Sequence, residues 1–376
     1  MRVNRTEWIR YGIFIPALVI LECFWLEDIL RASGNVWLYV ILYSFTVAYL
    51  LTPLVRLVSS KTGALDYPGE RNVHTHPTPL LGGVAIYVSF TITLLANHIL
   101  STQVKAVLVA GTLVFFLGVG DDVWGIPAWI KFLVQISIAV IPPLWGIYID
   151  IFPNTLIWHV AEVALTVMWI VGITNAFNFI DGMDGLATGI AAISCFFFGI
   201  IAMRTGQQLF LLITMALLGS SLGFLPYNFR HLKSAMLFLG DTGSTFIGFM
   251  LACIAVMGEW AEGDPVKALS VPLLIMGVLI LDMVYTTVSR LVLGKVGSFT
   301  EWLEYTGRDH LHHRLNSLGL SKNESVLFIY SFTAILGTGA VVIGRSSTTE
   351  VFLELFQALA IFSLVAILML RSRRED

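Results

Sequence analysis

The chain has 376 residues, of which 57% are apolar and only 12% are charged, and its net charge at pH 7 is −3. A soluble domain carries about 25% charged residues, so this composition excludes an ordinary soluble protein and predicts an integral membrane protein. The basic residues are scattered, which excludes a nucleic-acid-binding surface, and the three cysteines all fall in apolar runs, which argues against a disulfide framework or a cysteine metal site.

Apolar runs of about 17–25 residues, the length that crosses a bilayer, recur along the whole chain. The first follows Arg2, Arg5 and Arg10 as in a signal peptide, but no small-residue cleavage site follows it, so we interpret it as a membrane span. The sequence therefore predicts an all-α polytopic membrane protein with about 11–12 transmembrane helices, in which residues 1–376 form a single domain. The predicted spans are residues 9–28, 36–58, 82–100, 104–120, 129–149, 156–174, 186–203, 208–226, 244–258, 268–292, 325–344 and 350–370.

The distribution of Lys and Arg orients these spans. With both termini on one side, that side holds most of the 22 basic residues, and the positive-inside rule predicts that it faces the cytoplasm. Five polar segments, separated by membrane spans, all fall on this same side. We therefore expect one active site at the cytoplasmic face of the membrane.

The first polar segment, residues 66–83, reads DYPGERNVHTHPTPLLGG. Its prolines predict an ordered loop that is not helical. Arg71 and His74 are candidates for phosphate contacts, although a generic loop would explain this segment almost as well.

Asp121 and Asp122 come next, at the end of a span and flanked by glycines. A carboxylate at the membrane centre costs about 2.5–3.5 kcal/mol, so this pair belongs at the interface. The two acids are either a solvated turn or a functional pair that holds Mg²⁺ or acts as base or nucleophile. Lys131, near the start of the following span, either anchors that helix at the interface or reaches a diphosphate.

The third segment, NAFNFIDGMDG, places a polar side chain at every third position: Asn175, Asn178, Asp181 and Asp184. This spacing keeps the four side chains roughly on one side of a helical turn. Helix capping alone would need only one or two of them, so the pattern indicates a binding site. The adjacent glycines would let a ligand approach the backbone closely.

The fourth segment, FLGDTGS, places Asp241 between two glycines at the start of a span. Its backbone N–H groups could face an anion and its carboxylate could bind a cation, but the same pattern also occurs in ordinary turns and N-caps. The fifth segment, RDHLHHRL, gathers His310, His312, His313 and Arg314. These cations suit phosphate oxygens, and a basic solvated loop is the alternative.

Several carboxylates for one metal ion, several cations for phosphates and a site at the membrane surface together indicate phosphoryl transfer to or from a lipid. In this order, the five motifs resemble those of the polyprenyl-phosphate N-acetylhexosamine-1-phosphate transferases. The resemblance runs from about Asp66 to Leu315. It implies transfer of a sugar 1-phosphate from a UDP-sugar to undecaprenyl phosphate, with release of UMP and with Mg²⁺ (or Mn²⁺) as cofactor.

The resemblance also implies roles for individual residues. Asp121, Asp122 and Asp181 correspond to catalytic carboxylates, and Asp241, together with Asp121 and Asp181, would hold the metal ion. Asp184, Asn228 and Phe238 resemble a uridine pocket, in which the Phe238 ring is available for stacking on uracil. The other expected substrate contacts are Asn175, Asn178, Lys131, Arg71, His74, His310, His312, His313 and Arg314.

Within the family, HLHH followed by Arg resembles the WecA/TagO-like branch, which uses UDP-N-acetylglucosamine for the first membrane step of a cell-envelope polysaccharide. Another UDP-N-acetylhexosamine, or UDP-MurNAc-pentapeptide, is the alternative donor. A secondary transporter is a remote alternative, disfavoured because the acids lie at span ends on one face. The sequence leaves the prenyl chain length, the polymer pathway and assembly as a homodimer open.

Overall fold

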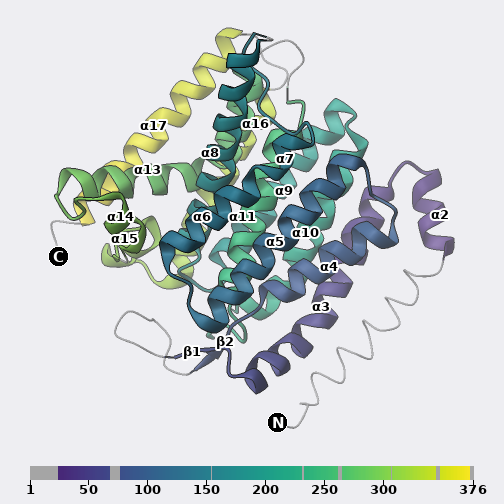
Figure 1. Ribbon diagram of the computed structural model, residues 1–376, viewed down its shortest axis with the longest axis horizontal. Helices are drawn as coiled ribbons and strands as arrows, with labels where there is room; N and C mark the ends of the chain where they lie inside the picture. The colour runs from purple at the N-terminus through teal and green to yellow at the C-terminus, as the bar shows by residue number, and fades with distance from the viewer. Residues whose placement is uncertain are drawn as a thin grey trace.

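The structure, a computed structural model, describes residues 24–67, 77–153, 155–230, 233–260, 265–305, 307–343 and 348–372. These residues form a bundle of helices with one two-stranded sheet (Figure 1). The predicted first span lies outside the described residues, apart from the part that overlaps α2. The elements are α2 (Phe24–Ala32), α3 (Val36–Thr62), β1 (Leu65–Asp66), β2 (Thr78–Pro79), α4 (Gly83–Ala96), α5 (Thr102–Trp124), α6 (Ala128–Ala139), α7 (Ile141–Leu144), α8 (Leu156–Ile180), α9 (Leu186–Thr205), α10 (Gln208–Asn228), α11 (Gly240–Met257), α12 (Pro265–Ile275), α13 (Gly277–Val292), α14 (Phe299–Glu304), α15 (Leu311–Ser317), α16 (Lys322–Ile343) and α17 (Thr348–Ser372).

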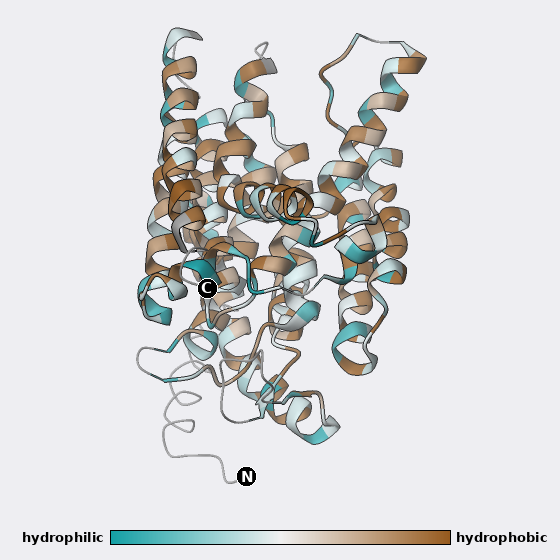
Figure 2. Ribbon diagram, turned by 90° about the vertical axis from the view of Figure 1, so that its left-hand side faces the viewer, coloured by the Kyte–Doolittle hydropathy of each residue, from teal (hydrophilic) through white to brown (hydrophobic). Residues whose placement is uncertain are grey.

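The all-α polytopic membrane architecture is confirmed. Among the described residues, eight helices are long and apolar enough to cross a membrane: α3, α5, α8, α9, α10, α11, α16 and α17. Figure 2 shows that apolar residues cover most of the length of these helices. Several of their hydroxyl side chains are satisfied within the helix, since Thr52, Thr174 and Thr214 each donate a hydrogen bond to the carbonyl four residues earlier.

Three predicted spans differ from single long helices. The segment predicted at 82–100 forms the shorter helix α4, and the one predicted at 129–149 forms α6 and α7, with Pro142 and Pro143 in α7. The segment predicted at 268–292 forms two helices, α12 and α13, which meet at a bend of 79°. Pro272 lies one turn before this bend and Gly277 directly after it, and both residues weaken the interior of a helix.

The centre of the bundle is packed around α9, α10 and α11. Helix α10 contacts α3 and α9, while α11 contacts α5 and α8. The largest fully buried side chains are phenylalanines: Phe90, Phe177, Phe198, Phe224, Phe246 and Phe249. Burial of each such side chain contributes about 1.5–3 kcal/mol where the alternative is water.

Helices α4, α5 and α11 touch through their backbones at one end of the bundle. A Cβ atom added to Gly83 would lie 2.1 Å from the Gly243 nitrogen, and one added to Gly118 would lie 2.6 Å from the Asp241 carbonyl oxygen. The contact is extended by the segment before α11, because Gly83 N donates to the Leu239 carbonyl and Phe238 N to the Pro79 carbonyl of β2. These contacts fix where α11 begins.

Candidate active site

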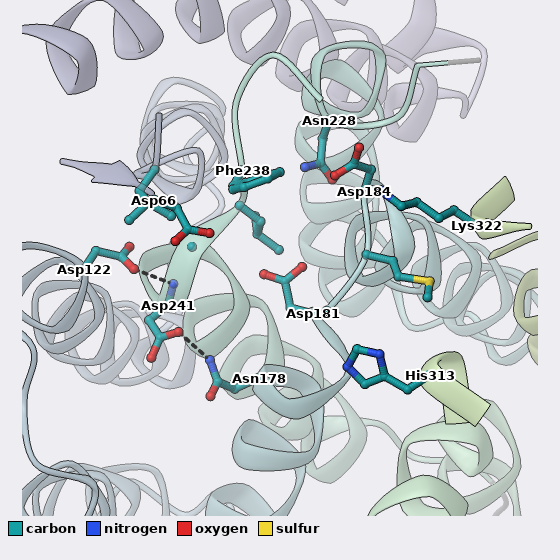
Figure 3. Close-up of a pocket in the computed structure, with 15 residues that line it drawn as sticks. Asp66, Asp122, Asn178, Asp181, Asp184, Asn228, Phe238, Asp241, His313 and Lys322 are labelled. Atoms are coloured by element: carbon teal, nitrogen blue, oxygen red, sulfur yellow. Dashed lines mark hydrogen bonds between the residues drawn. The ribbon is translucent and has the colours of Figure 1, made fainter. Parts of the chain in front are cut away.

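The polar motifs meet in one pocket of about 320 Å³ at this end of the bundle (Figure 3). It lies where α5, α8 and α10 end and where α9, α11 and α16 begin, beside β1 and α15. The structure therefore brings together four of the motifs that the sequence placed on one membrane face, with Asp66 from the 66–83 loop. The lining residues are Asp66, Leu80, Asp122, Asn178, Asp181, Gly182, Met183, Asp184, Asn228, Phe238, Leu239, Gly240, Asp241, His313 and Lys322.

Asp122 holds the start of α11. One of its carboxylate oxygens accepts a hydrogen bond from Asp241 N at 2.8 Å, and the other accepts from Thr242 N at 2.9 Å and from Thr242 Oγ1 at 2.6 Å. Gly240 has a φ of +73°, and a Cβ atom there would lie 2.5 Å from an Asp122 oxygen. Asp122 thus caps the exposed N–H groups of the helix and fixes the direction of the Asp241 side chain.

Lys131 lies between Asp121 and Asp241. Its ammonium group is 2.5 Å from an oxygen of each carboxylate. The other Asp121 oxygen accepts from Ile126 N at 2.7 Å, so both oxygens of Asp121 are engaged and this residue does not line the pocket. Lys131 therefore offsets the charge of two acids from different helices.

Asn178 forms the remaining hydrogen bond to the Asp241 carboxylate. Its Nδ2 donates to the second Asp241 oxygen and to Ser244 Oγ, at 2.9 Å in both cases. The structure therefore places Asn178 beside the site, as expected. Asn175 instead donates to Gln135 Oε1 and to the Val171 carbonyl, and lines an adjacent groove.

Asp181 directly follows α8, and its carboxyl group points into the open part of the pocket (Figure 3). In the part of the chain that the structure describes, no cation or hydrogen-bond donor pairs with this carboxyl group. Burial, together with the negative charges of Asp241, Asp122 and Asp184, raises the pKa of Asp181 well above its usual value. An unneutralised carboxyl group facing a cluster of acids is the setting in which a bound cation is favourable.

Asp184 and Asn228 organise the opposite wall of the pocket. Asp184 accepts from Ala235 N at 2.9 Å. The Asn228 side-chain oxygen accepts from Gly185 N and from Thr188 Oγ1, and its Nδ2 donates to the Leu237 carbonyl at 3.1 Å. Asn228 thus uses its amide to join α9 to the strand-like segment that carries Phe238. Phe238 also lines the pocket and lies between Asp66 and Asn228 (Figure 3).

The histidine cluster reaches the pocket through one member. His313 lines the pocket, whereas His310, His312 and Arg314 are buried and absent from its lining. The described contacts of His310 and Arg314 are with other protein groups. His312 packs on Gly182, where an added Cβ atom would lie 2.2 Å from its Nε2, and burial lowers the pKa of this imidazole well below its usual value. Arg71 and His74 lie outside the described residues.

The comparisons with known proteins agree with this arrangement. A family model described as "Glycosyl transferase family 4" matches residues 104–259. The chain is 34% identical, over 85% of its length and 88% of the relative, to a probable undecaprenyl-phosphate N-acetylglucosaminyl 1-phosphate transferase of Bacillus subtilis. The chain belongs to the polyprenyl-phosphate N-acetylhexosamine-1-phosphate transferase family.

Other members of this transferase family span similar shares of the chain. A decaprenyl-phosphate N-acetylglucosaminephosphotransferase of Mycolicibacterium smegmatis is 35% identical over 78% of this chain and 79% of its own. An undecaprenyl-phosphate alpha-N-acetylglucosaminyl 1-phosphate transferase of Escherichia coli K12 is 27% identical over 79% of this chain and 80% of its own. The matched region of the family model covers α5 to α11 and therefore Asp122, Asp181 and Asp241.

The oxygen donors of this transferase site fit a magnesium ion. The described residues contain no group of three His, Cys, Asp or Glu side chains arranged to hold a metal by themselves. Mg²⁺ commonly takes only one or two carboxylates from the protein and completes its shell with water and substrate phosphates. Asp181, whose carboxyl group has no partner among the described residues, and Asp241, which lines the same pocket, are suited to provide that pair.

One residue that lines the pocket and one that supports it carry no sequence signal that singled them out. Lys322 is the first residue of α16, and it enters the pocket because α16 begins beside Asp184 (Figure 3). Tyr330, two turns further along α16, donates to the Gly185 carbonyl at 2.5 Å and so supports the turn that holds Asp184. A lone lysine or tyrosine at the edge of an apolar run is too common to be distinguished without the fold.

Proposed function

We propose that the protein transfers N-acetylglucosamine 1-phosphate from UDP-N-acetylglucosamine to a polyprenyl phosphate and releases UMP. The observation that carries the proposal is the convergence of Asp122, Asp181, Asp184 and Asp241 with Lys131 at one end of a membrane bundle. The names of the relatives support the donor sugar and the class of acceptor. They include both undecaprenyl and decaprenyl phosphate, so we propose only a long prenyl chain.

The chemistry assigned to the site is an exchange of phosphate bonds. An oxygen of the lipid phosphate attacks the β-phosphorus of the donor, and the bond from that phosphorus to the bridging oxygen breaks. UMP leaves with the electron pair, and the sugar 1-phosphate remains on the lipid. Such a reaction needs alignment and charge compensation more than covalent help from the protein.

Mg²⁺ held by Asp181 and Asp241 would neutralise charge on the diphosphate. The chain's own residues prepare the site for it. Asp122 and Asn178 fix the Asp241 side chain, and Lys131 offsets part of the local negative charge. Asp121, unlike Asp241, does not line the pocket, and Lys131 and Ile126 engage its two oxygens. This favours a positioning role for Asp121 over a direct contact, and its action as proton acceptor or metal ligand stays a prediction.

An apolar groove beside the pocket could bind the hydrocarbon chain of the acceptor. An apolar groove of about 760 Å³ follows α8 from Val160 to Asn175 and is closed by α6, α13 and α14. Asn175 lines this groove, and Asn178, three residues further on, lines the pocket, so a lipid lying in the groove places its head group beside the acids. The groove residues are Phe132, Ile136, Val140, Val160, Val163, Ala164, Val167, Met168, Val171, Gly172, Asn175, Met283, Val284, Thr287, Val288, Phe299 and Trp302.

Filling the groove should therefore weaken acceptor binding selectively. We expect Ala164→Trp to raise the KM for a long-chain polyprenyl phosphate about tenfold while the KM for UDP-N-acetylglucosamine stays unchanged. Even one extra methylene group in an apolar binding site changes the binding free energy by about 1–3 kcal/mol. Val109→Trp is the matched control, since Val109 is exposed on α5 away from the groove. An equal rise in both KM values would show that the groove does not hold the acceptor.

The side of the membrane follows from charge. The topology predicted from the sequence puts most Lys and Arg residues on the same side as the polar motifs, so we propose that the site faces the cytoplasm of a bacterial inner membrane, where UDP-sugars are made. The whole proposal is tested by measuring UMP release by the detergent-purified protein with polyprenyl phosphate, Mg²⁺ and several UDP-sugars. We expect release with UDP-N-acetylglucosamine, abolished by EDTA and restored by excess Mg²⁺. Release with only another UDP-sugar would contradict the assigned donor.

A further inference from the structure

A buried polar network ties the histidine segment to α13. Asp282, in the middle of α13, accepts from Leu311 N at 2.6 Å with one oxygen and lies 2.7 Å from His310 Nδ1 with the other. Arg290, two turns further along α13, makes a bidentate ion pair with Asp309, at 2.8 and 2.7 Å. Asp282 and Arg290 are both 2% exposed, so these are not weak surface pairs.

The network fixes the hydrogen positions on His310. Arg290 Nη2, which can only donate, lies 3.2 Å from His310 Nε2, so this nitrogen acts as the acceptor. The proton on Nδ1 is then donated to Asp282. Both ring nitrogens are used within the protein, which explains why His310 does not reach the pocket.

The consequence of the network lies three residues further along the chain. His310 precedes α15, and its carbonyl accepts from His313 N at 3.0 Å in the first turn of that helix. The contacts of His310 with Asp282 and Arg290 therefore also set the direction of His313. Figure 3 shows the His313 ring directed toward Asp181. The same short helix also presses His312 against Gly182, next to Asp181.

A second tether prevents α15 from turning away. Arg314 donates from Nε to the Asp309 carbonyl at 2.7 Å and from Nη1 to the Met369 carbonyl of α17 at 2.9 Å. The bend of 79° between α12 and α13 sets the direction of the helix that carries Asp282 and Arg290. In Figure 1, α13 leads out of the central bundle toward α14 and α15.

We propose that Asp282 and Arg290 are positioning residues for the transfer reaction, which act by holding His310 and Asp309 so that His313 projects into the pocket. The inference rests on the proposed function, because it assigns His313 a contact with the transferred diphosphate. It gives a role to two charged residues that lie within an apolar helix and touch no part of the pocket.

A double-mutant cycle on the full-length protein in detergent tests this role. Asp282→Asn keeps the size of the side chain but turns one acceptor into a donor, which opposes the proton on His310 Nδ1. We expect Asp282→Asn and His313→Ala each to lower kcat/KM for UDP-N-acetylglucosamine about 100-fold, as for a misplaced contact. Because both changes remove the same contact, the double variant should be no worse than His313→Ala alone.

Independent effects would multiply to a loss of about 10⁴-fold and would overturn the proposal, as would a folded Asp282→Asn protein with normal kcat/KM. Glu304→Gln, an exposed change at the end of α14, is the matched control and should leave kcat/KM unchanged. If Asp282→Asn does not purify as a folded protein, the paired change Arg290→Gln with Asp309→Asn, which leaves no charge unpaired, takes its place in the cycle. An inactive wild-type protein in the same assay would instead count against the proposed function.

Discussion

Replacing Asp241 with asparagine is expected to lower the rate of UMP release by about 10³-fold while leaving the protein folded. The amide keeps the shape of the side chain and can still accept one hydrogen bond from Asn178 or Lys131. It loses the negative charge that pairs with Lys131 and that would hold the metal ion beside the diphosphate. Initial rates and thermal unfolding of the detergent-purified proteins measure the two parts of this expectation.

Asp150→Asn provides the control for this change. Asp150 is exposed near the opposite ends of α8 and α11, away from the pocket, so the same chemical change there should leave the rate unaltered. A near-normal rate for Asp241→Asn would remove Asp241 from the metal site. A lost rate that accompanies a lost unfolding transition would point to a structural role instead.

Adding a single methyl group at Gly83 is expected to reduce activity about 100-fold, because it moves the start of α11. The new Cβ atom would lie 2.1 Å from the Gly243 nitrogen and 2.2 Å from its Cα. Both are backbone atoms that cannot turn aside, so α4 and α11 must separate by about 1 Å or more, and overpacking of this kind typically costs about 1–3 kcal/mol in stability. The displacement falls on Asp241, two residues before Gly243.

Gly339→Ala is the control for this second change. Gly339 lies within α16, and the nearest atom to an added Cβ is the end of the flexible Glu354 side chain at 3.1 Å. Alanine there should be neutral or slightly stabilising, because it favours helix. If Gly83→Ala keeps full activity and an unchanged unfolding temperature, the close contact of α4 with α11 does not position the site.

Much of the fold could be predicted because a membrane span leaves a simple record in the sequence. Apolar runs of sufficient length mark α3, α5, α8 and α16 with soft boundaries, since each such helix satisfies its own backbone hydrogen bonds. The bend between α12 and α13 was missed because Pro272 and Gly277 stand inside an apolar run, where either residue can also occur in an unbroken helix.

The sequence predicted which residues meet at the site better than it predicted what each of them does there. Asp122, Asp181, Asp184 and Asp241 do meet in the pocket, as their motifs indicated. Asp122 caps α11 through hydrogen bonds to Asp241 and Thr242, which are 119 and 120 positions further along the chain. The local sequence does not reveal contacts over such a separation. Spacing alone likewise could not separate His313 in the pocket from its buried neighbour His310.

The position of the cleaved bond distinguishes transfer of the sugar 1-phosphate from transfer of the sugar alone. UDP-N-acetylglucosamine that carries a radiolabel only in its β-phosphate is incubated with the protein, polyprenyl phosphate and Mg²⁺, and the lipid and nucleotide products are separated. Attack at the β-phosphorus predicts that the label moves to the lipid and that the nucleotide released is unlabelled UMP. Labelled UDP together with an unlabelled lipid product would mean that the sugar alone is transferred, and would contradict attack at the β-phosphorus.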